Sequence, residues 1–274
     1  MSGGPRTSPR RRRRFEPPVN AAGVRAGVEG VPRWRPRVAG ERIFVALDVP
    51  GREAAMALAD RLPPELPGVK VGSVLFTRAG GDVVRELKGA GRRVFLDLKF
   101  HDTPQTVHGA VAAAVELGVD LVTVHASGGA RMLEAAREAR GEAPLTLLAV
   151  TLLTSLAGRD AAAIFGPGLL SLAEQVDRLA DLAADCGMDG VVTSGEETAR
   201  IKARHRESLL VLTPGVLPEW SRVDYRDQAR VTTPREALER GADLIVVGRA
   251  IHGASDPAQA ARRLLEEVQA VEVS

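Results

Sequence analysis

The chain has 274 residues, enough for one barrel-sized domain or two smaller ones, and its formal net charge is +2. A single cysteine, Cys186, excludes an internal disulfide, and no Cys and His spacing typical of a zinc site occurs. No apolar stretch is long enough to span a membrane, so we expect no membrane partner and a reducing, cytoplasmic location.

Residues 1–40 are rich in Arg, Pro and Gly and show neither strand nor helix periodicity, which is typical of a disordered segment. Positive charge is concentrated there, since residues 1–42 carry 11 Arg against three Glu and the remaining 232 residues carry a net −6. An acidic folded part lacks the basic face that nucleic-acid binding requires, so we expect no nucleic-acid partner for it. The arginine run at 10–14 precedes EPPVNAAG and no apolar segment, unlike an export signal. We therefore predict a disordered basic N-terminal tail, 1–40, and one folded domain, 41–274.

Short apolar runs rich in Val, Ile and Leu follow the tail. The eight runs are 43–49, 69–74, 93–99, 121–126, 145–151, 190–195, 209–215 and 244–249. Segments of helical period lie between them, and in the segment 103–118 Thr103 is a plausible N-cap with Pro104 at the first helical position. Near-continuous apolar strands joined by helices indicate a parallel sheet covered on both faces. Eight such units, with no GxGxxG after the first, predict an α/β fold, a (β/α)₈ TIM barrel, over an open doubly wound sheet.

Polar residues and glycines stand at the predicted strand ends, where such barrels place their chemistry. These are Asp48, Lys70, Asp97, Lys99, His125, Thr154, Pro214, Gly215, Gly248 and Arg249. Residues i and i+2 of a strand face the same side, so Asp97 and Lys99 should point together into the barrel mouth while Leu96 and Leu98 pack outward.

Asp97 and Lys99 could form a structural ion pair that closes the top of the barrel. An alternating array of Lys70, Asp97, Lys99 and Asp102 is nevertheless hard to justify as stability, because desolvating four charges costs more than packing leucines. The array therefore favours a functional site.

Glycines also end the seventh and eighth strands, in TPG (213–215) and VVGR (246–249), where barrels often bind phosphate. Arg249 adds a planar fork suited to two phosphate oxygens. We expect a phosphorylated small molecule with its reacting centre over Lys99. The histidines have no convergent spacing, so we expect no metal site, and packing is the expected role of His125.

Taken together, these segments resemble the bacterial orotidine 5′-phosphate decarboxylase family. The likeness covers 43–265 and rests on FLDLKFHDTPQT, LDV, VKVG, TVHASGG, LLTS, TPG with DQARVTTP, and VVGR. D-x-K-x-x-D followed by T-P-x-T is the specific combination. The resemblance implies conversion of orotidine 5′-monophosphate to UMP and CO₂ in pyrimidine biosynthesis, without cofactor or metal, by a homodimer with shared active sites.

The resemblance also implies residue roles. Lys99 would protonate C6, Asp97 would face the substrate carboxylate, and Lys70 would orient Asp97 and contact the ribose. Asp102 and Thr103 would come from the partner subunit and complete the other active site. The remaining implied contacts are Asp48 to the ribose hydroxyls, Thr154 to the pyrimidine, and Gln228, Gly248 and Arg249 to the phosphate.

One position departs from the family pattern. Bacterial members usually carry Arg two residues after the glycine of TPG, whereas this chain has Leu217 in a longer segment, GVLPEWSRVDYRDQ. Arg222 or Arg226 would have to substitute, or phosphate affinity would be lower.

Two alternatives stay open. Magnesium-dependent 3-keto-gulonate 6-phosphate decarboxylase and hexulose-6-phosphate synthase also carry D-x-K-x-x-D, but they place a metal-binding Glu near the end of strand two, where this chain has Lys70. The other alternative is an inert barrel whose arginine-rich tail binds nucleic acid. The intact array of Asp97, Lys99 and Asp102 argues against it.

Overall fold

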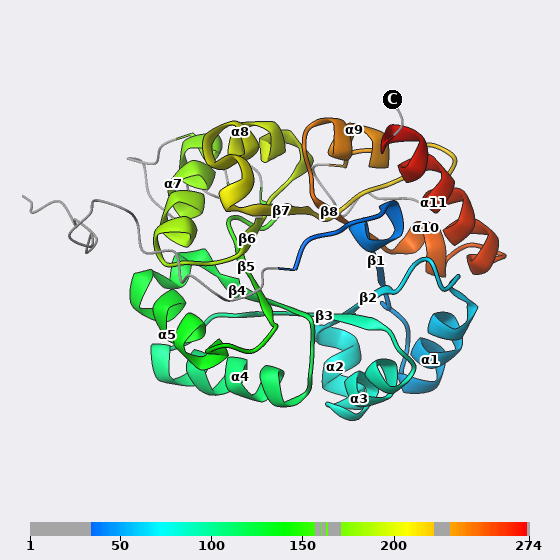
Figure 1. The fold of residues 1–274 in the computed structure, drawn as a ribbon, viewed down its shortest axis with the longest axis horizontal. Helices are drawn as coiled ribbons and strands as arrows, with labels where there is room; N and C mark the ends of the chain where they lie inside the picture. The colour runs from blue at the N-terminus through cyan, green and yellow to red at the C-terminus, as the bar shows by residue number, and fades with distance from the viewer. Residues whose placement is uncertain (1–33, 157–159, 161–162, 164–170, 222–230, 273–274) are drawn as a thin grey trace, which may run out of the picture.

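The structure, a computed structural model, describes residues 34–156, 160, 163, 171–221 and 231–272. Eight parallel strands within them close into a barrel in chain order, which confirms the predicted (β/α)₈ fold (Figure 1). The strands are β1 (Ile43–Ala46), β2 (Gly68–Gly72), β3 (Arg93–Phe100), β4 (Leu121–His125), β5 (Thr146–Val150), β6 (Gly190–Val192), β7 (Leu210–Thr213) and β8 (Leu244–Val247).

Helices surround the barrel as an outer layer (Figure 1). They are α1 (Arg52–Arg61), α2 (Ser73–Ala79), α3 (Asp82–Gly89), α4 (Pro104–Glu116), α5 (Ala130–Arg140), α7 (Leu172–Asp185), α8 (Gly195–His205), α9 (Pro234–Glu239), α10 (Arg249–His252) and α11 (Pro257–Glu272). Three short 3₁₀ turns, η1 (Ala39–Arg42), η2 (Ala126–Gly128) and η3 (Arg206–Ser208), complete the elements. Thr103 is the N-cap residue of α4 and Pro104 opens it, as predicted, although the Thr103 side chain makes no capping hydrogen bond.

Two apolar layers follow from the alternation of side chains along the strands. One lies between strands and helices, and the other fills the barrel interior with residues such as Phe44, Phe95 and Leu148. The rings of Phe44 and Phe95 meet edge to face with centroids 5.7 Å apart. A packed interior leaves the strand ends as the place for a site.

Trp34 packs against the interior layer although it precedes the first strand. Its ring meets Phe44 edge to face at 6.1 Å, and the Arg93 guanidinium lies 4.3 Å from the ring centroid. Arg35 forms an ion pair with Glu207 at 2.8 Å. Of the predicted tail, residues 1–33 lie outside the described residues, whereas this short stretch before residue 41 contacts the barrel.

An aspartate precedes three of the strands, β4, β6 and β8, and joins each to the strand before it. Asp120, Asp189 and Asp243 directly precede β4, β6 and β8, and each carboxylate accepts a backbone N–H from β3, β5 or β7 at 2.7 to 2.8 Å. Each also forms an ion pair, with Lys88, Arg140 and Lys202 respectively. The repeated Gly-x-Asp before these strands therefore braces the end of the barrel opposite the predicted site.

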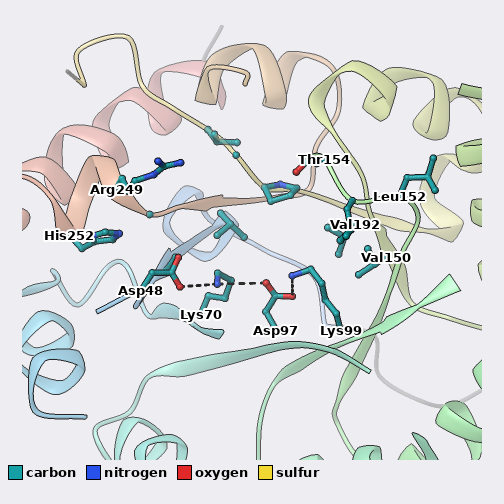
Figure 2. Close-up of a pocket in the computed structure, with 17 residues that line it drawn as sticks. Asp48, Lys70, Asp97, Lys99, Val150, Leu152, Thr154, Val192, Arg249 and His252 are labelled. Atoms are coloured by element: carbon teal, nitrogen blue, oxygen red, sulfur yellow. Dashed lines mark hydrogen bonds and ion pairs between the residues drawn. The ribbon is translucent and has the colours of Figure 1, made fainter. Parts of the chain in front are cut away.

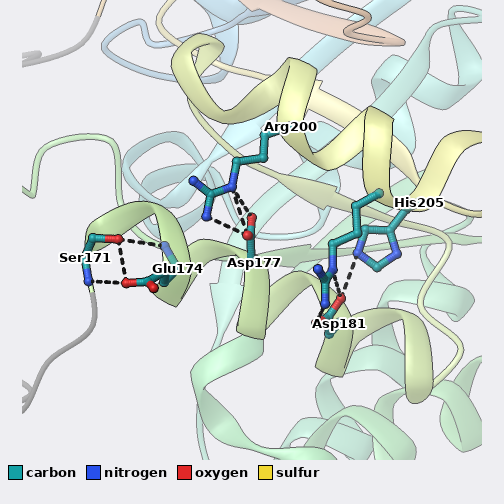
Figure 3. A network of polar contacts seen from close by, with 7 residues as sticks. Ser171, Glu174, Asp177, Asp181, Arg200 and His205 are labelled. Carbon is teal, nitrogen blue, oxygen red and sulfur yellow. Dashed lines mark hydrogen bonds and ion pairs between the residues drawn. The ribbon is translucent and has the colours of Figure 1, made fainter.

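Ion pairs also join α7 and α8 on the surface (Figure 3). Arg200 contacts Asp177 at 2.6 Å, and Asp181 is shared by Arg204 and His205. Ser171 and Glu174 form a capping box at the start of α7. Exposed pairs of this kind contribute only about 0–1 kcal/mol each, so they add little to the free energy of unfolding.

None of the described helices has the length and apolar character needed to cross a bilayer.

Candidate active site

Four charged side chains at or just after the ends of the first three strands form a continuous array at the mouth of the barrel (Figure 2). Lys70 Nζ lies 3.4 Å from Asp48 Oδ1 and 3.7 Å from Asp97 Oδ2, and Lys99 Nζ lies 2.8 Å from Asp97 Oδ1. Signs alternate along the array, so each ammonium is held by a carboxylate. The tertiary structure thus brings together four residues that the sequence analysis placed at the ends of three strands.

Burial differs along the array. The side chains of Lys70 and Asp97 are 11% and 12% exposed, whereas those of Lys99 and Asp48 are 35% and 55% exposed. Burial by itself would raise the pKa of Asp97, but the ammonium groups of Lys99 and Lys70 and the hydrogen bonds to the carboxylate outweigh it, so the pKa lies below its ordinary value. Asp97 is therefore a fixed negative charge at neutral pH.

The strand that carries Asp97 and Lys99 is irregular at these residues. Both side chains line the cavity, while Leu96 and Leu98 belong to the layer under the helices, as predicted. The register with β4 nevertheless shifts between Leu96 and Phe100, and Lys99 has a φ of 52°. A left-handed backbone at a lysine is unfavourable and marks a position that its surroundings hold in place.

The array lines one side of a cavity of about 470 Å³. Val150, Val192 and Val246 contribute apolar lining. The remaining predicted strand-end residues that line it are Thr154, Pro214, Gly215, Gly248 and Arg249. A cavity that combines apolar residues with charged groups suits a flat ring that carries polar substituents.

His252 also lines this cavity, which the sequence analysis did not foresee. Its Nε2 is buried and has no hydrogen-bond partner among the described residues. Burial lowers the pKa of His252. The Asp48 carboxylate opposes this effect, whereas the positive charges of Arg249 and Lys70 lower the pKa further. Arg249 and His252 are three residues apart in α10, which begins at the arginine of VVGR, and this spacing was the signal in the sequence.

Other predicted site residues lie apart from this cavity. Asp102 and Thr103 are exposed, do not line it, and interact with each other, since the Thr103 N–H donates to Asp102 Oδ1 at 2.6 Å. Gln228 lies outside the described residues, as do Arg222 and Arg226. Leu217, at the position of the usual arginine, packs against the core.

The two histidines after β3 and at the end of β4 lie beside the array. His101 and His125 have ring centroids 5.1 Å apart. Burial, followed by the charges of His101 and Lys99, lowers the pKa of His125 to about 4. His125 is therefore neutral at pH 7 and does not line the cavity, which agrees with the packing role expected for it. Within the described part of the chain, no three His, Cys, Asp or Glu side chains are grouped as metal ligands would be.

The chain is similar to known proteins in sequence and in fold. The family described as "Orotidine 5′-phosphate decarboxylase / HUMPS family" matches residues 41–264. The chain is similar to orotidine 5′-phosphate decarboxylases of Pseudomonas aeruginosa (strain LESB58) and Pseudomonas syringae pv. tomato, each 50% identical over 231 residues, covering 82% of this chain and 97% of the relative. It also resembles the crystal structure of orotidine 5′-phosphate decarboxylase from Lactobacillus acidophilus, with 36% identity and a TM-score of 0.72 over 84% of this chain and 99% of that one.

Proposed function

The chain belongs to the orotidine 5′-phosphate decarboxylase / HUMPS family, and we propose on this premise that it converts orotidine 5′-monophosphate to UMP and CO₂ in pyrimidine biosynthesis. The enzyme is a carboxy-lyase. The observation that carries the proposal is the alternating array of Lys70, Asp97 and Lys99 at the mouth of the cavity.

In the proposed reaction the bond between C6 and the carboxylate breaks, and its electron pair stays on C6. The pyrimidine offers no conjugated sink for this pair, so a positive charge near C6 must stabilise it. The Lys99 ammonium then transfers a proton to C6, which forms the new C–H bond, and solvent returns a proton to the lysine amine. Lys99 suits this role because it lines the cavity while Asp97 holds its ammonium at 2.8 Å.

Electrostatics gives the scale of this effect. A unit positive charge about 3 Å from a carbanion contributes about 5 kcal/mol at an effective dielectric near 20. The negative charge grows along the reaction, so the attraction is stronger in the transition state than in the bound substrate, which is the condition for raising the rate. Asp97 stays ionised and faces the substrate carboxylate, a repulsion that loss of CO₂ relieves.

The rest of the cavity binds the nucleotide in this proposal. Lys70 orients Asp97 and contacts the ribose, whose hydroxyls Asp48 holds. The pyrimidine lies against the apolar residues and Thr154. The phosphate occupies the opposite end, held by Gly248, Arg249 and Gln228.

The proposal includes a homodimer in the cytoplasm. Asp102 and Thr103 are exposed and stand apart from their own cavity, so they are available to complete the site of a second subunit. Within the motif D-x-K-x-x-D, only the first Asp and the Lys line the cavity of their own chain. This supports a site that two subunits share.

Magnesium-dependent sugar-phosphate chemistry on the same barrel fits this site less well. A divalent cation would need free carboxylates, but Asp48 and Asp97 both contact the Lys70 ammonium, which would repel it. The proposed reaction therefore uses no metal.

The test is decarboxylation of orotidine 5′-monophosphate followed by ultraviolet absorbance, in excess EDTA, with Lys99→Ala alongside. We expect turnover that persists in chelator and falls by several orders of magnitude in the variant. Absence of turnover by folded wild-type protein would refute the proposal, and sugar phosphates with Mg²⁺ would then be the substrates to assay.

A further inference from the structure

Thr123, in the middle of β4, connects the two residues of β3 that face the cavity. Its hydroxyl accepts a hydrogen bond from the Lys99 backbone N–H at 2.9 Å and donates one to Asp97 Oδ1 at 3.0 Å. The residue is completely buried and does not line the cavity. A single buried hydroxyl thus satisfies two groups on one neighbouring strand.

These contacts lie where the regular ladder between β3 and β4 is interrupted. Leu96 is in register with Val122 and Phe100 with Val124, so three residues, 97–99, stand opposite Thr123 alone. The Lys99 N–H donates to the Thr123 hydroxyl instead of to a β4 carbonyl. Because Lys99 also has a left-handed φ of 52°, this hydrogen bond holds an otherwise unfavourable backbone.

The same hydroxyl orients the carboxylate of Asp97. Oδ1 receives both the Thr123 hydroxyl and the Lys99 ammonium, which leaves Oδ2 toward Lys70 at 3.7 Å. Thr123 therefore acts on Lys99 at its backbone and on Asp97 at its side chain. A shift of either group by about 1 Å would cost about 100-fold in rate, if it moves a reacting atom out of line.

We propose that Thr123 is a positioning residue of the decarboxylation, whose hydroxyl fixes the reach of the Lys99 ammonium and the orientation of Asp97. It touches neither the substrate nor the reacting atoms. This inference rests on the proposed function and extends it to a residue of the neighbouring strand.

The test compares Thr123→Val with Thr123→Ser. Valine keeps the shape and loses both hydrogen bonds, whereas serine keeps the hydroxyl and leaves a methyl-sized void. We expect kcat of Thr123→Val to fall by about 10- to 100-fold with KM within about threefold of wild type, and Thr123→Ser to retain kcat within about threefold. Thr146→Val, the same change at a buried threonine that opens β5 away from the site, is the control and should keep wild-type kcat.

The serine variant separates positioning from stability. A purely structural role would make activity follow the free energy of unfolding, so that the void in Thr123→Ser would also lower activity. Equal kcat values in the valine and serine variants, or a valine variant within twofold of wild type, would overturn the inference.

A second measurement distinguishes failure of this inference from failure of the proposed function. The carboxyl ¹³C signal of Asp97 can be titrated without substrate, and loss of the Thr123 hydroxyl should raise the pKa of Asp97 in the valine variant but not in the serine variant. If wild type does not decarboxylate the nucleotide, the proposed function fails while this titration still tests the contact. An unchanged titration in Thr123→Val would refute the positioning role.

Discussion

A β-carbon built on Gly72 would lie 3.0 Å from Lys70 Nζ and 3.4 Å from Asp48 Oδ1. Lys70 and Gly72 are neighbours on the same face of β2. Because Gly72 has no side chain, the Lys70 ammonium has room to lie between the carboxylates of Asp48 and Asp97. Gly72 has extended backbone angles that any residue adopts, so the requirement is for space and not for conformation.

Gly72→Ala should therefore impair catalysis more than folding. The methyl group displaces Lys70 Nζ by a few tenths of an ångström or more, and we expect kcat/KM to fall by about 10- to 100-fold. Steady-state kinetics with thermal unfolding measures both effects. Gly89→Ala is the matched control, because Gly89 is exposed and its added β-carbon meets nothing within 4 Å. This variant should keep the wild-type kcat/KM. Equal activity of the two variants would contradict the spatial argument.

The aspartates that brace the strands should differ in their contribution to stability. The pair of Asp189 and Arg140 is 4% exposed on both side chains, whereas Asp120 and Lys88 are 29% and 30% exposed. Removing one partner of a buried pair costs about 3–5 kcal/mol because the other charge stays buried without compensation. We expect Asp189→Ala to lower the free energy of unfolding by that amount and Asp120→Ala by less, as measured by urea denaturation. The reverse order would show that the backbone hydrogen bonds, and not the buried charges, dominate.

Acid should destabilise the protein through His125. Its pKa is 6.5 in an ordinary environment and about 4 in the fold. Between these values the unfolded chain binds a proton that the folded protein does not, so the free energy of unfolding falls as pH decreases through this window. The change in pKa corresponds to at most about 3–4 kcal/mol, and solvent screening of a half-buried ring reduces it to about 1–2 kcal/mol.

Urea denaturation at several pH values between about 4.5 and 7.5 measures this slope, and His125→Gln should flatten it. His108→Gln on α4 controls for loss of a histidine elsewhere. Asp97 does not contribute in this window, because its pKa lies below the ordinary carboxyl value of 3.8. A slope unchanged in His125→Gln would assign the acid sensitivity to other groups.

Two truncations should locate the start of the stable domain. Deleting residues 1–33 leaves the contacts of Trp34 with Phe44 and Arg93 intact, whereas deleting 1–40 removes them. Loss of a packed aromatic side chain costs about 3 kcal/mol or more, so we expect the longer deletion to lower the melting temperature by several degrees and the shorter one to leave it unchanged. Equal melting temperatures would place the boundary at residue 41, as the sequence composition predicts.

Mixing two inactive variants tests the shared site. Lys99→Ala and Asp102→Ala each disable every site of their own homodimer in the proposed arrangement. A mixed dimer has one site with both changes and one site with neither, so re-equilibrated equimolar mixtures should recover about one quarter of wild-type activity. No recovery, with mixed dimers demonstrated by mass spectrometry, would place Lys99 and Asp102 in the same site of one chain.

The eight apolar runs and the helical periods between them were sufficient to predict the barrel, because burial on both faces of a parallel strand requires a continuous apolar sequence. The same pattern placed Asp48, Lys70, Asp97 and Lys99 at strand ends, and parallel strands bring those ends to one side of the barrel. Local sequence thus determined which residues could meet and on which side of the fold.

Only the tertiary structure determined how these groups meet. The contact of Lys70 with both carboxylates depends on the register of three strands, and the role of Thr123 depends on a register shift that no periodicity reveals. Packing of Trp34 against Phe44 and the buried Nε2 of His252 beside the cavity are likewise long-range contacts. Side-chain periodicity reports burial within one element, whereas the distances between charged groups that set the chemistry arise from how separate elements pack.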